Sequence, residues 1–429
     1  MVKGYLKYLD FGYKPTKNDL VCLFRFKAGK GKTKKEAAGA IAAESSTGTW
    51  TKLSTVSEKR QLKLGAKVFE LKGDYAKIAY PLELFELGNM PQILSSIAGN
   101  IYGMLEVETL RLEDIQWPKK MINSFKGPKF GMNGVRKVLG IKKRPLCGTI
   151  IKPKIGLNEK EHAKVAYDAW AGGLDIVKDD ENLTSQSFNK FKKRVQETLK
   201  LRDRAEKETG EKKIYMANVT AETDEMIRRA EFLKKSGSEY AMVDILTVGW
   251  SGLQTLRNEN EKLKLVLHGH RAMHAALTRN KEHGMSMLTL AQISRLIGMD
   301  QLHIGTAVGK MEGEKKEIKT ILDNIEKQKV PETKRNFSQD WGNMKPVFAV
   351  CSGGLHTGHI PALVKFFGKD IIIQAGGGAH GHPGGTIEGA VAIRQAIDAV
   401  MKNIPQREYA KSHPELKMAV DKWGVYNTR

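Results

Sequence analysis

Short apolar runs alternate with longer amphipathic stretches from about residue 145 onward. The runs predict strands, and apolar residues that recur every three to four positions predict helices. Helices are expected in 158–173, where Asn158 is a suitable N-cap, and in 221–237, 289–298 and 386–403. Eight strands are expected, in PLCGTIIKP (145–153), LDIVKDD (174–180), KIYMANVT (213–220), YAMVDIL (240–246), LKLVLHGH (263–270), QLHIG (301–305), KPVFAVCSGG (345–354) and DIIIQAGGG (370–378).

This alternation predicts an α/β fold with a parallel sheet, and eight units in about 260 residues favour a (β/α)8 TIM barrel. An open doubly wound sheet is the alternative, but no GxGxxG motif opens the series. A smaller α+β N-terminal domain is expected before the barrel, with strands in 20–29 and 66–85 and helices in 33–50 and 89–104. WPKKMINSFKGPKFGMNG (117–134) has the Pro and Gly of a connector. The predicted boundaries are 1–125 for the N-terminal domain, 126–144 for the connector, 145–410 for the barrel and 411–429 for a C-terminal segment.

The composition is that of a folded protein with no membrane segment. Of the 429 residues, 41% are hydrophobic, which suffices for an ordinary core. No apolar run approaches the roughly 20 residues of a transmembrane helix, and the N-terminus lacks the apolar stretch of a secretory signal. The cysteines, Cys22, Cys147 and Cys351, are far apart and predict neither a disulfide framework nor a zinc site. A cytoplasmic location is therefore expected.

The chain is strongly basic, with 71 Lys and Arg against 48 Asp and Glu, a net charge of +23. Such a charge fits either a nucleic-acid-binding protein or a lysine-rich protein that acts on an anionic metabolite. The lysines are spread along the whole chain, and no RRM, KH or C2H2 pattern is present. A solvated basic surface is the favoured interpretation.

Catalytic groups of a (β/α)8 barrel lie where strands end, and here those positions carry charged residues and Gly-rich turns. Asp180 and Glu181 follow the second strand, and their oxygens suit Mg²⁺. Lys178 beside them would repel a cation unless its charge is removed, as by carbamylation with CO₂. The Gly-rich turns after strands 7 and 8 are where a phosphate usually binds. Arg271 suits a phosphate, and Lys310 in GTAVGKMEGE has the Gly-flanked setting of a mobile lid.

These motifs resemble those of the large subunit of ribulose-1,5-bisphosphate carboxylase/oxygenase (RuBisCO). The similar segments are GTIIKPK, GGLDIVKDDEN, HGHRAMHAA, HIGTAVGKMEGE, SGGLH and GGGAHGHPGG, with AAESSTGTW and GNIYGM near the N-terminus. The resemblance covers nearly the whole chain. The compact length and short ending, KWGVYNTR, resemble the archaeal, form III-like type that works without a small subunit.

The resemblance implies a carbon–carbon lyase that carboxylates, and also oxygenates, ribulose 1,5-bisphosphate in archaeal AMP or nucleotide salvage. It implies one Mg²⁺ per site, held by Asp180, Glu181 and a CO₂-derived carbamate on Lys178. Lys152 would move protons, with Lys154 beside it, His270 would assist, and Lys310 would close over the site. The implied substrate-binding residues are Lys154, Arg271, His303, Lys310, Ser352, Gly353, Gly354, Gln374, Gly376, Gly377, Glu44, Thr49, Trp50 and Asn100.

In the family, Glu44, Thr49, Trp50 and Asn100 complete the site of the other subunit, so the resemblance implies a homodimer, or a ring of dimers. One departure is Ile150, where many members have Thr; Thr149 is one place earlier. A second departure is the short ending, which does not resemble the long C-terminal tail that holds the lid closed in plant-type enzymes. A RuBisCO-like enolase or isomerase of sulfur salvage is the alternative function, and a nucleic-acid-binding protein is a remote one.

Overall fold

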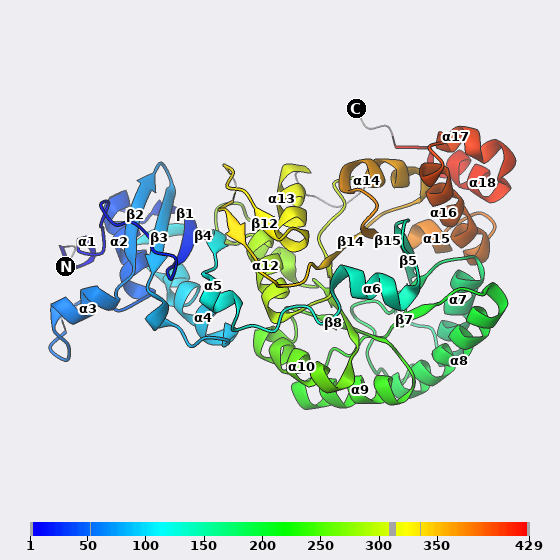
Figure 1. The fold of residues 1–429 in the computed structure, drawn as a ribbon, viewed down its shortest axis with the longest axis horizontal. Helices are drawn as coiled ribbons and strands as arrows, with labels where there is room; N and C mark the ends of the chain where they lie inside the picture. The colour runs from blue at the N-terminus through cyan, green and yellow to red at the C-terminus, as the bar shows by residue number, and fades with distance from the viewer. Residues whose placement is uncertain (1–2, 52, 309–314, 335, 427–429) are drawn as a thin grey trace. The chain divides into compact units, whose positions relative to one another are not determined.

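The computed structural model describes residues 3–51, 53–308, 315–334 and 336–426 (Figure 1). The chain divides into two compact units. Unit 1 contains Met1–Lys126, Met273–Ile297 and Lys327–Met344; unit 2 contains Gly127–Ala272, Gly298–Glu326 and Lys345–Arg429. Two segments that lie between predicted barrel strands in the sequence therefore pack with the N-terminal part of the chain.

Unit 1 is built on a five-stranded sheet of order β10-β4-β1-β3-β2. Its strands are β1 (Leu20–Ala28), β2 (Lys67–Lys72), β3 (Tyr75–Tyr80), β4 (Val107–Gln116) and β10 (Gly284–Met285). The pairs among β1 to β4 are antiparallel, whereas β10 pairs parallel to β4, with Gly284 opposite Arg111. Helix α2 (Lys34–Glu44) starts at a capping box of Thr33 and Glu36, and its residues Ala37–Ala43 are buried.

The other elements of unit 1 are short. They are α1 (Lys3–Leu6), α3 (Glu58–Leu64), η1 (Leu82–Leu84), α4 (Met90–Ile97), η2 (Asn100–Gly103), α5 (Lys119–Ile122), α11 (His274–Thr278), α12 (Met287–Ile297), β12 (Lys329–Val330) and β13 (Gln339–Asp340). The sequence did not predict strand β4 or the short elements α1, α3, α5, β10, α11, β12 and β13. Strand β4 has few bulky aromatic residues and is interrupted by charges, so its pattern is weak.

Unit 2 is an eight-stranded parallel barrel, which confirms the predicted fold class. The strand order is β7-β6-β5-β15-β14-β11-β9-β8, and a parallel bridge between Asn218 and Met242 joins the ends of this series. Each of the eight predicted strands is present. They are β5 (Leu146–Ile150), β6 (Ile176–Lys178), β7 (Ile214–Met216), β8 (Tyr240–Asp244), β9 (Val266–His270), β11 (Gln301–His303), β14 (Phe348–Ser352) and β15 (Ile371–Gln374).

Helix α6 (Gly131–Leu139) covers the amino-terminal end of the barrel. Its Val135 and Leu139 belong to one buried cluster with the first residues of several strands, among them Leu146, Ile176 and Val266. The predicted connector segment 117–134 thus contains the start of a helix, whose Gly131 adopts φ +63° beside Pro346. Because this end of the barrel is filled with apolar side chains, polar chemistry belongs at the carboxyl end of the strands.

Helices surround the barrel, and the first four of them lie side by side in chain order in Figure 1. They are α7 (Glu159–Ala171), α8 (Phe191–Thr209), α9 (Thr223–Lys235), α10 (Gly249–Leu263), α13 (Lys315–Glu326), η3 (Thr357–His359), α14 (Ile360–Phe367), α15 (Gly377–His380), α16 (Thr386–Met401), α17 (Gln406–Tyr409), η4 (Ala410–Ser412) and α18 (Pro414–Trp423). Asn158 caps α7 in a capping box with Glu161, as its sequence predicts. No helix in the described part of the chain is long and apolar enough to span a bilayer.

Candidate active site

Two lysine–carboxylate pairs stand at the carboxyl ends of neighbouring strands β5 and β6. The ammonium group of Lys152 contacts the Asp180 carboxylate, and that of Lys154 contacts Glu181. Burial alone would raise the pKa of Asp180, but contacts with Glu181 and Lys152 bring it below its usual range. The hydrogen bond to Glu181 raises the pKa of Lys154. Each carboxylate therefore already contacts a lysine side chain at this end of the barrel.

Lys178 ends strand β6 and is entirely enclosed by the barrel. Its Nζ donates to the Asp179 carbonyl oxygen at 2.8 Å and lies 3.2 Å from the Met242 sulfur. Burial lowers the pKa of Lys178, although Asp180 and Asp244 oppose this effect. A lysine with a lowered pKa offers a larger neutral fraction, and only a neutral amine can add to CO₂.

The donor set fits Mg²⁺ if Lys178 is carbamylated. Among the described residues, no group of three Asp, Glu, His or Cys side chains forms a metal site by itself. Asp180 and Glu181 supply two carboxylates, and a carbamate on Lys178 would supply the third anionic oxygen ligand. Three oxygen ligands with room for substrate oxygens suit Mg²⁺, which prefers octahedral oxygen coordination.

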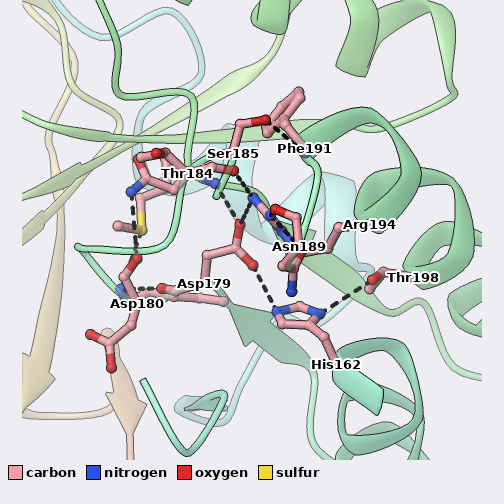
Figure 2. A network of polar contacts seen from close by, with 12 residues as sticks. His162, Asp179, Asp180, Thr184, Ser185, Asn189, Phe191, Arg194 and Thr198 are labelled. Atoms are coloured by element: carbon pink, nitrogen blue, oxygen red, sulfur yellow. Dashed lines mark hydrogen bonds and ion pairs between the residues drawn. The ribbon is translucent and has the colours of Figure 1, made fainter. Parts of the chain in front are cut away.

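Asp179 points away from this group and into a buried polar network between β6 and helices α7 and α8 (Figure 2). Arg194 Nη2 lies 3.1 Å from Asp179 Oδ2, and His162 Nε2 lies 3.0 Å from Oδ1. Tyr215 donates its hydroxyl to Oδ1 at 2.7 Å, and the Asn218 backbone N–H donates to Oδ2 at 3.0 Å. The pKa of Asp179 is below its usual range because these partners, Arg194 foremost, outweigh its desolvation.

This network fixes the backbone between Lys178 and Asp180. Arg194 also donates to the Thr184 carbonyl oxygen at 2.8 Å, which ties the loop after β6 to helix α8. No pattern in the sequence distinguishes His162, Arg194 or Tyr215. One signal was present: successive residues at a strand end point to opposite sides, so Asp179 had to face away from Lys178 and Asp180.

His270 and Asp244 form a third polar pair, at the ends of β9 and β8. His270 Nδ1 lies 2.8 Å from Asp244 Oδ1. Burial raises the pKa of Asp244 to about 6, and burial together with Lys178 lowers the pKa of His270 to about 3. His270 is therefore a neutral imidazole at physiological pH. The neighbouring Arg271 has its pKa lowered by burial to about 10 and stays cationic.

A chain of hydrogen bonds runs through three strands beside His270. Gln301 Oε1 lies 2.9 Å from His268 Nδ1, and His268 Nε2 lies 2.9 Å from His303 Nε2. His303 Nδ1 lies 2.7 Å from the Ser352 hydroxyl oxygen. We call this set, Gln301, His268, His303 and Ser352, the Gln301–Ser352 chain. Its first three members are buried and Ser352 is half-buried, so the chain leads from the barrel interior to the site.

The Gly-rich turns after β14 and β15 lie next to Ser352 and Lys152, respectively. Gly353 and Gly354 have φ of +111° and +66°, which a residue with a side chain rarely adopts. A Cβ on Gly376 would lie 3.0 Å from Lys152 Cε, so this glycine leaves room for the lysine. Gln374 is buried in the barrel, and its Oε1 has no hydrogen-bond partner among the described residues. Gly377 begins α15.

Thr149 does not take the place of the threonine that Ile150 replaces. Its hydroxyl donates to the Ala375 carbonyl oxygen at 2.8 Å and lies 3.0 Å from His380 Nε2, inside the wall of the barrel. His380 is further bound by Thr386 at 3.1 Å, and burial lowers its pKa to about 4. His380 is thus engaged in hydrogen bonds within the loop and strand structure.

Four of the candidate site residues, Glu44, Thr49, Trp50 and Asn100, belong to unit 1. Glu44 ends α2 and accepts a hydrogen bond of 2.7 Å from the Tyr5 hydroxyl. Thr49 and Trp50 follow in a loop, where Trp50 is 65% exposed, and Asn100 is exposed at the start of η2. Lys310 lies outside the described residues. Unit 2 therefore brings together the lysines, carboxylates, histidines and glycines that the sequence placed at strand ends.

Comparison with known proteins decides the family. The profile of the ribulose bisphosphate carboxylase large chain catalytic domain matches residues 131–423, and that of its N-terminal domain matches residues 7–121. This chain belongs to the RuBisCO large-chain family. The archaeal RuBisCO relatives include a ribulose bisphosphate carboxylase of Methanosarcina mazei, 53% identical over 97% of this chain and 98% of the relative. Another, from Methanocaldococcus jannaschii, is 51% identical over 97% of this chain and all of the relative.

Solved RuBisCO structures have the same fold. The dimeric archaeal RuBisCO from Hyperthermus butylicus matches with a TM-score of 0.93 and 45% identity, over 98% of this chain and all of that one. The octameric RuBisCO from Pyrococcus horikoshii matches with a TM-score of 0.91 and 46% identity, over all of this chain and 99% of that one. The two RuBisCO relatives thus differ in assembly while sharing one subunit fold.

Proposed function

We propose that this protein catalyses the Mg²⁺-dependent carboxylation of ribulose 1,5-bisphosphate to two molecules of 3-phosphoglycerate, and the oxygenation of the same substrate. The observation that carries the proposal is the position of Lys178, buried with a lowered pKa beside Asp180 and Glu181. Relatives with 53% and 51% sequence identity to this chain are named ribulose bisphosphate carboxylases, which supports the same reaction here.

Activation would begin at Lys178. Its neutral amine adds to CO₂: the nitrogen lone pair forms the N–C bond, and the amine gives up one proton. The product carries a negative charge where the free lysine was neutral or positive. Lys178 in this form, Asp180 and Glu181 would hold Mg²⁺, which when bound supplies a Lewis acid for the oxygens of the substrate.

Lys152 and Lys154 are the groups closest to these carboxylates. Their ammonium groups contact Asp180 and Glu181 in the free protein, so both have cationic ends in the site. Lys152 would move protons at the reacting carbons, and Lys154 would bind the substrate beside it. His270, neutral and oriented by Asp244, would assist proton transfer.

Two groups of residues would hold the two phosphates. Arg271, His303 and Ser352 would hold one of them. The other would be bound by the Gly-rich turns and by residues of the second subunit. The members of this second group are Gly354, Gly376, Gly377, Thr49 and Trp50. Gly353, Gln374, Glu44 and Asn100 would complete the site, and Lys310 would close over it. A homodimer, alone or in a ring of dimers and without a small subunit, would be the active form.

The proposed setting is cytoplasmic nucleotide (AMP) salvage, as the archaeal resemblance suggests. A product assay tests the reaction. Ribulose 1,5-bisphosphate, CO₂ and Mg²⁺ without oxygen should give two 3-phosphoglycerate per substrate consumed, and oxygen in place of CO₂ should be taken up in an oxygen electrode. Consumption of the substrate without new carboxylate, or no reaction with it at all, would favour the enolase or isomerase alternative instead.

A further inference from the structure

The hydrogen bonds of the Gln301–Ser352 chain can all run in either of two directions, and the groups at its two ends determine which direction is adopted. Burial lowers the pKa values of His268 and His303 well below the usual range, so both rings are neutral. A neutral imidazole carries one N–H and one lone pair. Since the rings meet through their Nε2 atoms at 2.9 Å, one ring must donate and the other must accept.

The placement of the Gln301 side chain sets one direction. Its Oε1 faces His268, and its Nε2 donates toward the Tyr240 hydroxyl at 3.5 Å. An oxygen can only accept, so the proton of His268 is on Nδ1 and its Nε2 accepts from His303. His303 Nδ1 must then accept the hydroxyl proton of Ser352. In this direction Ser352 presents only lone pairs to the site.

A phosphate cannot be bound well in that direction. Both ring nitrogens of His303 are engaged within the chain, so the ring has no N–H left for a ligand. The hydroxyl proton of Ser352 is also turned inward. Phosphate oxygens accept hydrogen bonds, and they would meet lone pairs on Ser352.

The opposite direction gives the anion a donor. If the carboxamide of Gln301 turns by half a turn, its N–H donates to His268 Nδ1. The proton of His268 then resides on Nε2, that of His303 resides on Nδ1, and the Ser352 hydroxyl points outward. Each ring loses a proton from one nitrogen and gains one on the other, so the charge of the chain does not change.

We propose that the Gln301–Ser352 chain reverses direction when a phosphate group binds at Ser352, and that Gln301 is a positioning residue for that phosphate. This inference rests on the proposed function, since it takes one phosphate of the substrate to be held directly by Arg271 and Ser352, with His303 acting through the Ser352 hydroxyl. Glutamine suits the inner end because it has both a donor and an acceptor and can terminate the chain in either direction.

Nitrogen-15 NMR of the full-length protein with labelled histidine tests the reversal, because protonated and unprotonated ring nitrogens have different chemical shifts. His268 and His303 are assigned from the spectra of single-site variants. Without ligand we expect one tautomer of each ring: Nδ1–H for His268 and Nε2–H for His303. Saturating inorganic phosphate should invert both rings together. Bound phosphate that leaves the rings unchanged, or inverts only one, would overturn the inference.

Variants at the two ends of the chain, Ser352 and Gln301, distinguish a hydrogen-bonding role of these residues from a role in packing alone. Ser352→Ala should bind phosphate about 10-fold or more weakly, the effect of losing one hydrogen bond to a charged group, and its rings should no longer respond. Ser352→Thr keeps the hydroxyl and should keep the response. Gln301→Met neither donates nor accepts, so both tautomers of each ring should coexist in its free form; single tautomers as in the wild type would deny Gln301 its role.

Calorimetry of phosphate binding distinguishes failure of the proposed reversal from failure of the proposed substrate site. Binding that Arg271→Met weakens, without inversion of the rings, would overturn the reversal and leave the proposed substrate site standing. Phosphate binding that is the same in the wild type, Arg271→Met and Ser352→Ala would overturn both, since the anion would then bind elsewhere.

Discussion

Arg194 Nη2 lies 3.1 Å from Asp179 Oδ2, and both side chains are wholly buried behind the carboxylates of the site. Removal of one member of a buried ion pair leaves the other charge without a partner, which costs about 3–5 kcal/mol. We therefore expect Arg194→Met to lower the free energy of unfolding by that amount. Equilibrium urea unfolding measures the change.

Arg204, on the same helix, gives a matched control. It pairs with Glu208 at 2.8 Å, but both side chains are largely exposed. Exposed pairs contribute about 0–1 kcal/mol, so Arg204→Met should change the unfolding free energy little. Equal losses for the two variants would contradict the role given to the buried network around Asp179.

The pH dependence of activation follows from Lys178. Its neutral form adds CO₂, and burial lowers its pKa from the usual value near 10.4. The rate of carbamate formation should therefore rise with pH and reach half of its maximum at a lower pH than for an exposed lysine. Chemical trapping of the carbamate followed by mass spectrometry measures the rate at residue 178. A midpoint at the pH of an ordinary lysine would contradict the assignment.

Subunit sharing is tested by complementation. Glu44→Gln and Lys178→Ala should each be inactive, because one removes the proposed contribution of the partner subunit and the other the activated lysine. When the two variants are unfolded and refolded together, a mixed dimer would contain one site with neither change. Partial recovery of carboxylase activity is expected. No recovery in proven mixed dimers would mean that each subunit builds its own site.

The lid prediction concerns Lys310. Carboxylation creates a new negative charge, and a cation supplied by a closing loop would stabilise it. Lys310→Met should lose carboxylation by about 10²-fold or more, the scale for loss of one charge-stabilising donor. Exchange of the C3 proton of the substrate with solvent, which precedes CO₂ addition, should remain measurable. Equal loss of both steps would assign Lys310 to binding or enolisation instead.

The barrel could be predicted because each of its strands is a short apolar run that ends in a distinctive polar group. Lys178 at the end of β6 and His303 at the end of β11 were found in this way. The return of segment 273–297 to the sheet of unit 1 could not be predicted, since β10 is only Gly284–Met285 and its pairing with β4 joins residues far apart in the sequence. Local patterns carry no information about such contacts.

The strand-end positions of the candidate site residues could be predicted from the sequence, but the contacts between their side chains could not. The sequence placed Lys152 and Asp180 at adjacent strand ends, but not their contact, which depends on the orientation of both side chains. It likewise left Gln301 without a role, because an amide in a short buried strand has no distinguishing pattern. Its function depends on a register that sets it beside His268 on the next strand.

Carbon dioxide fixation is the decisive test of carboxylase activity in this protein. The wild-type protein, activated with CO₂ and Mg²⁺ and supplied with ribulose 1,5-bisphosphate and ¹⁴CO₂ without oxygen, should form acid-stable radioactivity that comigrates with 3-phosphoglycerate. Lys178→Ala, assayed in parallel, should form none above background. Absence of fixation by the activated wild-type protein would contradict the proposed carboxylase activity, and equal fixation by the two proteins would contradict the role of Lys178.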